Sequence, residues 1–411
     1  MSTASFDSTT ACRVVRIITR LNIGGPSIQA ITLFDRLDKA GFQTTLVHGR
    51  LGPREGDMTY LLPAGRVSTA YLPALRRSIN PLDDIYACWQ IFRLLCRARP
   101  RIVHTHMAKA GALGRMAAIA YNRTVGRRSP ARLVHTYHGH VFEGYFPDRS
   151  TSTFLAIERW LARRTDVIVA ISDRIRRDLL DTYRIGRGNQ VRTIPLGFDL
   201  TPFAAIDARD RQRARDQLSL TPSDSVVTTI GRLTPIKDHR SFLEMARQVA
   251  QRRPATVFLI VGDGELRPKL KELAAAWDLT GRVRFLGWRR DLATIYGATD
   301  VFVISSRNEG TPVALIEAMA AGVSSVSTDV GGVRDVISGP DDGLLVPAGA
   351  ASALADAVCS LLDAPDRRHQ MAASGRQSVL ARFSLDRLLA DVAELYRNLT
   401  RFPQRTSSDP E

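Results

Sequence analysis

The segment VFVISSRNEGTPVALIEAMAAG, residues 301–322, combines a strand, a loop and a helix. Its first residues form a short apolar run, which is typical of a buried strand. From Val313 on, nearly every residue is apolar, and a helix that is apolar all round is buried. Thr311 is expected to cap this helix, with Pro312 at its first position and Gly322 at its end. The segment therefore predicts one strand–helix repeat of a parallel sheet.

The same alternation of apolar strands and helical patterns runs through both halves of the chain. Strands are expected to begin near residues 13, 42, 101, 132, 166 and 191 in the first half, and near 225, 256, 283, 301, 324 and 343 in the second. Such alternation predicts parallel sheets covered on both faces. We therefore expect an α/β protein with two similar sheet domains that face each other. A ligand should bind in a cleft between them, at the carboxyl ends of the strands.

A change of composition marks the boundary between the two sheets. Residues 200–224 are rich in charge and contain no run typical of a strand, which predicts a linker. The domains are expected at 13–199 and 225–380. A C-terminal helix at 381–400 is expected to pack back across them. The expected tails are residues 1–12 and 401–411.

Composition predicts an ordinary globular protein, with 44% hydrophobic and 24% charged residues. The four cysteines form no CxxC pair and no regular spacing, which indicates a reducing compartment. The first residues lack an apolar signal-peptide core, and no run of about eighteen apolar residues predicts a membrane-spanning helix. Together these features predict a cytoplasmic protein.

Positive charge is concentrated in the first half of the chain. Residues 1–200 hold 30 Lys and Arg against 15 Asp and Glu, whereas residues 201–411 hold 27 against 26. One interpretation is an anionic partner, namely the inner face of a membrane, an anionic acceptor or nucleic acid. The alternative is a solvated, arginine-rich surface. No nucleic-acid-binding module accompanies the charge, so nucleic acid is not expected as a partner.

The loop and helix of residues 301–322 are suited to bind an anionic ligand. A helix start offers unpaired N–H donors and about half a positive charge, which together attract a diphosphate. Glu309 precedes the helix and Glu317 lies within it, eight positions later. Carboxylates accept hydrogen bonds from vicinal sugar hydroxyls. Glu317 could instead be an ordinary exposed charge, but the apolar helix around it predicts burial and therefore a partner.

Two other loops of the second half follow strands and carry candidate ligand-binding residues. GRLTPIKD contains Arg232 and Lys237, which could neutralise a diphosphate leaving group or could simply be solvated. IVGDGELR places Gly262, Asp263 and Gly264 directly after a strand, where glycine allows close backbone approach to a ligand. Neither GxGxxG nor GxxxxGK[ST] occurs, so neither the dinucleotide fingerprint nor the P-loop is present.

Taken in order, these motifs resemble the retaining glycosyltransferases of family 4, which have the GT-B fold of two facing Rossmann-like domains. The resemblance covers about residues 13–400. It rests on the Glu-x7-Glu pattern of EGTPVALIEAMAAG and on GRLTPIKD, VGDGE, FLGW and STDVGGVRDVI. In the first half it rests on RLNIGGP, HTHMAKAGALGR, VHTYHGHVFEGYF and IPLGFD. Asp335 departs from the pattern, because relatives often carry Glu there.

The resemblance implies a transfer from a nucleotide sugar, most commonly a UDP-sugar, to a saccharide or lipid-linked acceptor in glycoconjugate synthesis, without a metal or other cofactor. The candidate catalytic residues are His138, Arg232, Lys237 and Glu309. The candidate donor-binding residues are Gly24, Gly25, Gly262, Asp263, Gly264, Gly310, Thr311, Pro312, Val313 and Glu317. Glu317 would bind the ribose, and Glu309 and His138 would contact the sugar. Arg232 and Lys237 would bind the diphosphate.

The first half also offers acceptor-side candidates. His104 and His106 precede a turn into a helix, and with Lys109 they could line the acceptor side. A zinc site among the histidines is disfavoured because no carboxylate or cysteine accompanies them. Two rival functions remain open, a nucleotide-sugar epimerase or hydrolase on the same fold, and a non-catalytic binder of membranes or nucleic acid.

Overall fold

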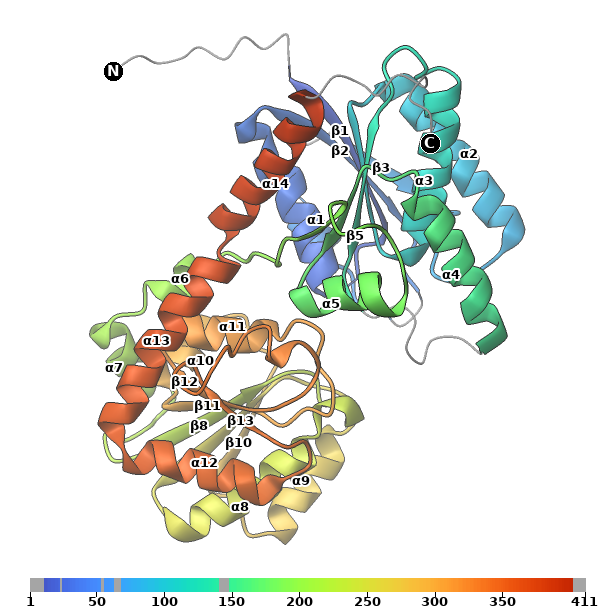
Figure 1. Ribbon diagram of the computed structural model, residues 1–411. Coiled ribbons are helices and arrows are strands. Elements are labelled where there is room, and N and C mark those ends of the chain that lie inside the picture. Colours follow the sequence, from blue (N-terminus) through green and yellow to red (C-terminus); the bar gives the residue numbers. More distant parts are fainter. Residues whose placement is uncertain (1–10, 23, 53–54, 63–67, 140–147, 402–411) are drawn as a thin grey trace, which may run out of the picture. The chain divides into compact units, whose positions relative to one another are not determined.

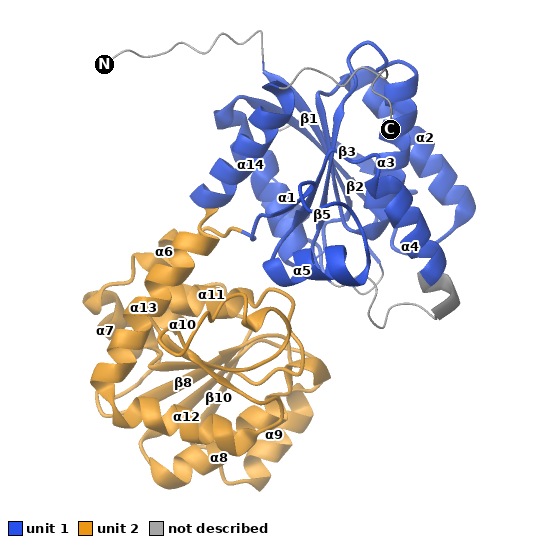
Figure 2. Cartoon of the chain, viewed as in Figure 1, with its two compact units in different colours: residues 1–196, 386–411 blue, residues 197–385 orange. Residues whose placement is uncertain are grey.

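The computed structural model describes residues 11–22, 24–52, 55–62, 68–139 and 148–401 (Figure 1). Most of the two expected tails, and the HVFEGYF part of one first-half motif, lie outside the described residues. The chain divides into two compact units (Figure 2). Unit 1 comprises Met1–Leu196 and Asp386–Glu411, and unit 2 comprises Gly197–Leu385.

Unit 1 contains a seven-stranded parallel sheet in the order β3-β2-β1-β4-β5-β6-β7. Its strands are β1 (Cys12–Arg20), β2 (Phe42–Gly49), β3 (Thr69–Leu72), β4 (Ile102–His106), β5 (Arg132–Tyr137), β6 (Val167–Ala170) and β7 (Val191–Thr193). Its helices are α1 (Gly25–Arg36), α2 (Pro81–Ala98), α3 (Ala108–Arg123), α4 (Asp148–Ala162), α5 (Asp173–Arg177) and α14 (Leu385–Arg401), with short turns η1 (Leu37–Ala40), η2 (Thr59–Leu61) and η3 (Asp178–Thr182). The strand order reverses between β1 and β4, which makes their carboxyl ends a natural ligand site.

Unit 2 contains a six-stranded parallel sheet in the order β10-β9-β8-β11-β12-β13. Its strands are β8 (Ser225–Ile230), β9 (Thr256–Val261), β10 (Val283–Gly287), β11 (Val301–Ile304), β12 (Ser324–Thr328) and β13 (Leu344–Val346). Its helices are α6 (Thr201–Ala204), α7 (Ala208–Gln217), α8 (His239–Arg252), α9 (Arg267–Ala276), α10 (Leu292–Ala298), α11 (Val313–Ala320), α12 (Ala351–Asp363) and α13 (Pro365–Phe383), with turns η4 (Pro235–Lys237) and η5 (Gly331–Val333). Here the order reverses between β8 and β11.

These two sheets confirm the expected α/β fold of two Rossmann-like domains. Gly322 follows the end of α11 in a left-handed conformation, as predicted. Other details differ. Residues 200–224, expected to be a linker, contain α6 and α7 within unit 2. The expected cap at Thr311 is wrong, because α11 begins at Val313 with Pro312 at the capping position and no side-chain cap.

The C-terminal helix α14 is part of unit 1 rather than of unit 2, which precedes it in the chain (Figure 2). Its buried residues Leu388, Val392 and Leu395 join a core with residues of β1, β2 and β5. The Tyr396 ring packs edge-on against Phe42, with centroids 5.3 Å apart. The core of the first domain is therefore completed by the end of the chain. No helix among the described residues is long and apolar enough to cross a membrane.

Substitution of a buried α14 residue should destabilise unit 1. Leu388 is fully buried in this core, so Leu388→Ala should lower the free energy of unfolding by about 2–5 kcal/mol because it leaves a cavity. Urea denaturation followed by circular dichroism would measure the change. Arg397→Ala, at an exposed position of the same helix, should change it by less than about 0.5 kcal/mol. Equal effects of the two substitutions would contradict the packing of α14.

Candidate functional site

The loops at the carboxyl ends of the unit 2 strands are joined to one another by backbone hydrogen bonds. The Leu233 amide, after β8, donates to the Asp263 carbonyl, after β9, at 2.9 Å. The Gly332 amide, after β12, donates to the Glu309 carbonyl, after β11, at 2.9 Å. These contacts join the loops of four adjacent strands in two pairs, one on either side of the point where the strand order reverses. This is the place where an open parallel sheet binds its ligand.

Two glycines of these loops are needed because any side chain at their positions would collide with the backbone of a neighbouring loop. Gly262 has a φ of 131°, and a Cβ there would lie 2.0 Å from the Gly231 carbonyl oxygen. Gly331 has a φ of 49°, and its Cβ would lie 1.9 Å from the Glu309 carbonyl oxygen. The sequence predicted that the Gly262 backbone lies close to a ligand. In the structure it lies close to the backbone of the neighbouring loop, at Gly231. Gly310, by contrast, has open space where its side chain would be.

Lys237 and Glu309, assigned to different parts of the ligand from the sequence, contact each other. The Lys237 ammonium lies 2.6 and 2.9 Å from the two Glu309 carboxylate oxygens. The Ser306 hydroxyl donates to the same carboxylate at 2.6 Å. The Glu309 side chain is 7% exposed, whereas the Lys237 side chain is 29% exposed. The carboxylate is therefore fully engaged, and it holds the more accessible ammonium in one place.

The loops after β8 and β9 also contain the predicted site residues Arg232 and Asp263, and only Arg232 is accessible. Arg232 is exposed, and no described side chain pairs with it. Asp263 accepts a hydrogen bond from the Gly264 amide at 2.8 Å and pairs with Arg267 at 2.8 Å. Asp263 therefore shapes its own loop, and Arg232 is the accessible positive charge.

Glu317 is half-buried on α11, and Tyr296 of α10 is its partner. The Tyr296 hydroxyl lies 3.0 Å from a Glu317 carboxyl oxygen and 3.0 Å from the Ala314 carbonyl. Burial raises the pKa of Glu317 to about 7, partly offset by the Tyr296 hydrogen bond. Five of the eight residues of α11, namely Leu315, Ile316, Ala318, Met319 and Ala320, are buried, and Val313 and Ala314 at its start are half-buried. Glu317 is thus a carboxyl group whose charge state changes near neutral pH.

In unit 1, Gly24 and Gly25 lie at the start of α1, the first helix after β1. Gly24 has a φ of 156°, and its carbonyl accepts from the Ser27 amide at 3.2 Å. A Cβ on Gly25 would lie 3.2 Å from the Leu196 side chain. Their loop follows one of the two strands at which the sheet of unit 1 reverses its order.

The histidines of unit 1 form a hydrogen-bonded group rather than an acceptor surface. His104 and His106 are 2% and 0% exposed, so neither ring is open to an acceptor, contrary to the sequence-based expectation. His106 Nδ1 lies 2.9 Å from Nε2 of His138, which is half-buried at the end of β5. Lys109 is bound to Asp84 of α2 at 2.5 Å, and so it is not a free acceptor contact either.

Four residues that the sequence did not single out support these groups, namely Arg16, Tyr296, Ser306 and Tyr396. Arg16 had a usable signal, because a lone arginine inside the apolar strand RVVRIITR must be buried and must find partners. The other three carry no such signal, since their contacts join segments that only the folded chain brings together.

Comparison with known proteins adds sequence and fold relationships. The family described as "Glycosyltransferase Family 4" matches residues 23–201, and "Glycosyl transferases group 1" matches residues 224–364. The chain is 29% identical over 376 residues to the UDP-Gal:alpha-D-GlcNAc-diphosphoundecaprenol alpha-1,3-galactosyltransferase of Escherichia coli, covering 90% of this chain and 93% of that protein. It is 26% identical over 324 residues to the putative glycosyltransferase EpsD of Bacillus subtilis, covering 78% and 83%.

Solved structures share the fold. HepE of Anabaena, in complex with UDP, superimposes with a TM-score of 0.77 at 19% identity, covering 94% of this chain and all of that one. WaaG, a glycosyltransferase involved in lipopolysaccharide biosynthesis, superimposes with a TM-score of 0.68 at 14% identity, covering 93% and 99%. With the two parallel sheets, the ordered loop motifs and the two family matches, the chain belongs to the family 4 glycosyltransferases and has the GT-B fold.

Proposed function

We propose that this glycosyltransferase moves a sugar, with retention of configuration and without a metal or other cofactor, from a UDP-sugar to a saccharide or lipid-linked acceptor in cell-surface glycoconjugate synthesis. The observation that carries the proposal is the contact of Lys237 with Glu309, just before the start of α11 and at the strand-order reversal of unit 2, with the exposed Arg232 in the same loop as Lys237. Cations and free helix amides in one place are suited to a diphosphate that gains negative charge as it leaves.

The donor would bind to unit 2 through three kinds of contact. The amides of Gly310, Thr311 and Val313 would face the diphosphate or the sugar, and the open space at Gly310 leaves room for this approach. Arg232 and Lys237 would supply the positive charge. Glu317, as a carboxylate, would accept hydrogen bonds from the ribose hydroxyls.

The choice of UDP and of a lipid-linked acceptor rests on relatives. The Escherichia coli relative is named for transfer from UDP-Gal to a diphosphoundecaprenol-linked saccharide. HepE has been solved with UDP and with UDP and glucose. These names support, for this chain, a UDP-sugar donor and an acceptor that carries a lipid diphosphate.

The contacts of Glu309 favour a mechanism without a protein nucleophile. Its carboxylate is bound by Lys237 and by Ser306, so it is held to position the ammonium rather than to attack a sugar. In the proposed reaction the bond between the anomeric carbon and the phosphate oxygen breaks. The acceptor hydroxyl forms the new bond on the same face, and its proton passes to the departing phosphate. Retaining glycosidases use two carboxylates differently, with one as the nucleophile.

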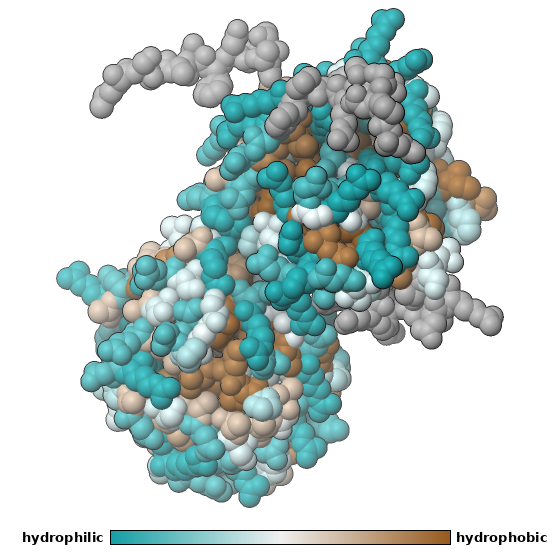
Figure 3. Space-filling model, in the orientation of Figure 1, coloured by the Kyte–Doolittle hydropathy of each residue, from teal (hydrophilic) through white to brown (hydrophobic). Residues whose placement is uncertain are grey.

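The exposed face of α2 supports a membrane surface as the place where the acceptor is met. Leu82, Ile85, Tyr86 and Trp89 recur at helical spacing and are between 47% and 81% exposed. Figure 3 shows apolar side chains on the outer edge of the molecule over α2. The Arg93 guanidinium lies over the Trp89 ring, 4.7 Å from its centroid. A helix face that combines aromatic, aliphatic and basic side chains is typical of binding to anionic lipid headgroups.

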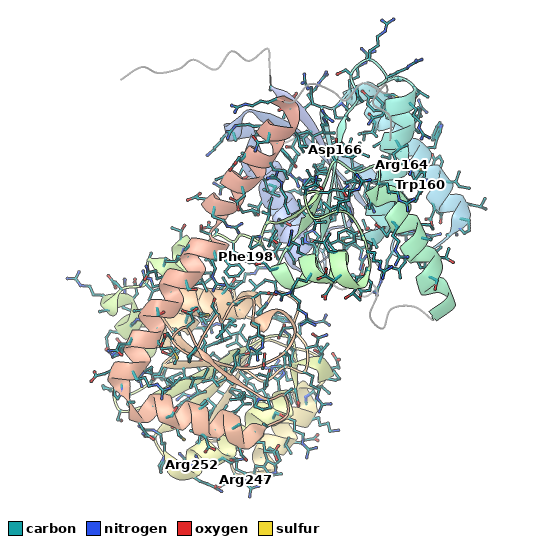
Figure 4. All side chains as sticks on the ribbon, viewed as in Figure 1. Trp160, Arg164, Asp166, Phe198, Arg247 and Arg252 are labelled. Carbon is teal, nitrogen blue, oxygen red and sulfur yellow. The ribbon has the colours of Figure 1, made fainter. Side chains whose placement is uncertain are left out.

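The acids of α2 do not cancel this charge, because both are paired. Asp84 binds Lys109 and Asp83 binds Arg76. A second exposed tryptophan of unit 1 also has an arginine stacked over its ring, since the Arg164 guanidinium lies 4.2 Å from the centroid of Trp160 near the end of α4 (Figure 4). We therefore propose peripheral association with the inner face of a membrane through the face of α2.

The proposed reaction is tested by supplying the protein with a panel of UDP- and GDP-sugars and a lipid-diphosphate-linked saccharide. We expect transfer from one UDP-sugar, unchanged by EDTA, with the anomeric configuration of donor and product the same by NMR. Lys237→Ala should reduce kcat about 100- to 1000-fold, because the leaving group loses a fixed cation.

The matched control is Arg247→Ala, at an exposed position on α8 (Figure 4), which should leave kcat unchanged. Release of the nucleotide without any need for an acceptor would favour the epimerase or hydrolase instead.

Donor affinity should depend on pH through Glu317. Its pKa of about 7 means that the carboxyl is largely protonated at pH 6 and ionised at pH 8. If only the carboxylate accepts from the ribose, the Kd of a UDP-sugar should be about tenfold higher at pH 6 than at pH 8. The diphosphate of a nucleotide sugar is a diester and does not titrate in this interval. Burial lowers the pKa of His239, beside Lys237, to about 4, so it also stays neutral.

Calorimetry across this interval would measure the effect. Glu317→Gln should bind more weakly but with a flat pH dependence. A wild-type profile as flat as that of the variant would show that Glu317 does not bind the donor through its carboxylate.

Membrane association predicts that the protein sediments with vesicles containing phosphatidylglycerol and much less with pure phosphatidylcholine. The double variant Leu82→Glu and Trp89→Glu should lose most of this binding, because it removes apolar area and adds negative charge. Trp288→Glu alters a tryptophan of unit 2 that is even more exposed, at 64% against 47% for Trp89, and should bind as the wild type does. Undiminished binding by the α2 variant would rule out this face.

A further inference from the structure

A chain of hydrogen bonds in unit 1 runs from Arg16, in the middle of β1, to His138 at the end of β5. Arg16 is fully buried, and no described carboxylate pairs with it. Its Nη1 lies 2.8 Å from Nε2 of His106, and Nδ1 of His106 lies 2.9 Å from Nε2 of His138. Parallel pairing places Arg16 of β1 beside β4, which contains His106, and β4 beside β5, which His138 directly follows.

Each hydrogen bond in this chain has only one possible direction. A guanidinium can donate but not accept, so His106 Nε2 must be the acceptor and must lack a proton. A neutral imidazole carries its proton on the other nitrogen, so His106 Nδ1 is the donor to His138 Nε2. His138 Nε2 then lacks a proton as well, and the proton of the His138 ring is on Nδ1. Arg16 thus determines, through His106, which nitrogen of the His138 ring carries the proton.

Both rings stay neutral over the working pH range. Burial and the charge of Arg16 lower the pKa of His138 to about 3. Burial, followed by the neighbouring His104 and Arg16, holds the pKa of His106 well below its usual value. The other titratable groups near them, His104 and His135, are also neutral, since burial and nearby positive charge lower their pKa values well below the usual range.

A second branch of contacts fixes Arg16 itself. Its Nη2 donates to the Tyr396 hydroxyl of α14 at 2.8 Å, and that hydroxyl donates to His104 Nδ1 at 2.6 Å. His104 Nε2 in turn donates to the Thr136 hydroxyl at 2.7 Å. The proton positions on this branch are compatible with those on the first, because Arg16 acts as the donor to Tyr396 as well as to His106.

The end of the chain is a donor without an acceptor. His138 Nδ1 has no hydrogen-bond partner among the described residues. A buried N–H without a partner is unfavourable until an acceptor arrives. In unit 1 this group lies at the carboxyl edge of the sheet, where ligands of such sheets bind.

We propose that Arg16 and His106 are positioning residues that hold His138 as a neutral ring with its proton on Nδ1. His138 then donates one hydrogen bond to a sugar oxygen of the substrate and cannot take a proton from the acceptor. The part that concerns the sugar rests on the proposed function. The tautomer itself does not, because it is built into the unliganded protein.

The test is NMR of the full-length protein labelled with 15N-histidine, without ligand. His138 is assigned by the signals lost in His138→Asn. We expect its Nδ1 to have the chemical shift of a protonated ring nitrogen and its Nε2 that of an unprotonated one, unchanged between pH 6 and pH 9. A proton on Nε2, or a ring that becomes charged in this range, would overturn the proposal on the wild-type protein alone.

Two substitutions of His106 separate positioning from bulk packing. His106→Leu removes the donor, so part of the His138 population should shift its proton to Nε2, and kcat should fall about tenfold. His106→Asn keeps an amide N–H where Nδ1 was, so both the tautomer and kcat should be largely restored. His135→Asn changes another buried histidine, outside the chain of bonds, and should leave the His138 signals unchanged.

A His138 tautomer unaffected by His106→Leu would contradict the positioning role. If the wild type transfers no sugar at all, the proposed function fails, while the tautomer measured by NMR still decides the inference made here.

Discussion

The ion pair between Lys237 and Glu309 joins the two loops between which the sheet of unit 2 reverses its order. The lysine comes from the turn after β8 and the glutamate from the loop after β11, so the pair connects adjacent strands at their carboxyl ends. Because Glu309 is buried and Lys237 is partly exposed, the acid serves as an anchor and the cation faces outward. The glycine contacts, the start of α11 and the exposed Arg232 belong to the loops at the same ends of these strands and their neighbours.

Unit 1 also contains a buried positive charge, that of Arg16, but no described carboxylate pairs with it. A buried charge is tolerated only when hydrogen bonds surround it, and Arg16 is surrounded by two histidines and a tyrosine. Elsewhere in the same unit, Arg115 is buried against Glu158, at 2.6 Å, in the usual way. An ion pair would neutralise the charge of the arginine. Neutral partners such as histidine and tyrosine instead have their own donor and acceptor atoms set by the guanidinium, which can only donate.

Much of the fold could be predicted from the sequence, because buried parallel strands and amphipathic helices carry strong periodic patterns. β3 (Thr69–Leu72) was missed because it is a short edge strand with one buried residue. α13 was missed because its buried residues are only Met371, Gly375, Val379 and Phe383, within an otherwise polar segment. Glu309, Glu317 and Lys237 were predicted as site residues from motifs. The partners of these residues could not be found, since hydrogen bonds such as Tyr296 to Glu317 depend on the packing of one helix against another.

The place of α14 has a consequence for how the protein is made. The core of unit 1 needs side chains from beyond residue 385, and these are synthesised only after the whole of unit 2. Domains generally fold as the chain emerges, the N-terminal one first. Here that order cannot be completed, because the first domain to leave the ribosome still lacks one helix of its core. Unit 2 has all of its residues before unit 1 does, and until α14 is synthesised the part of the unit 1 core that it completes stays uncovered.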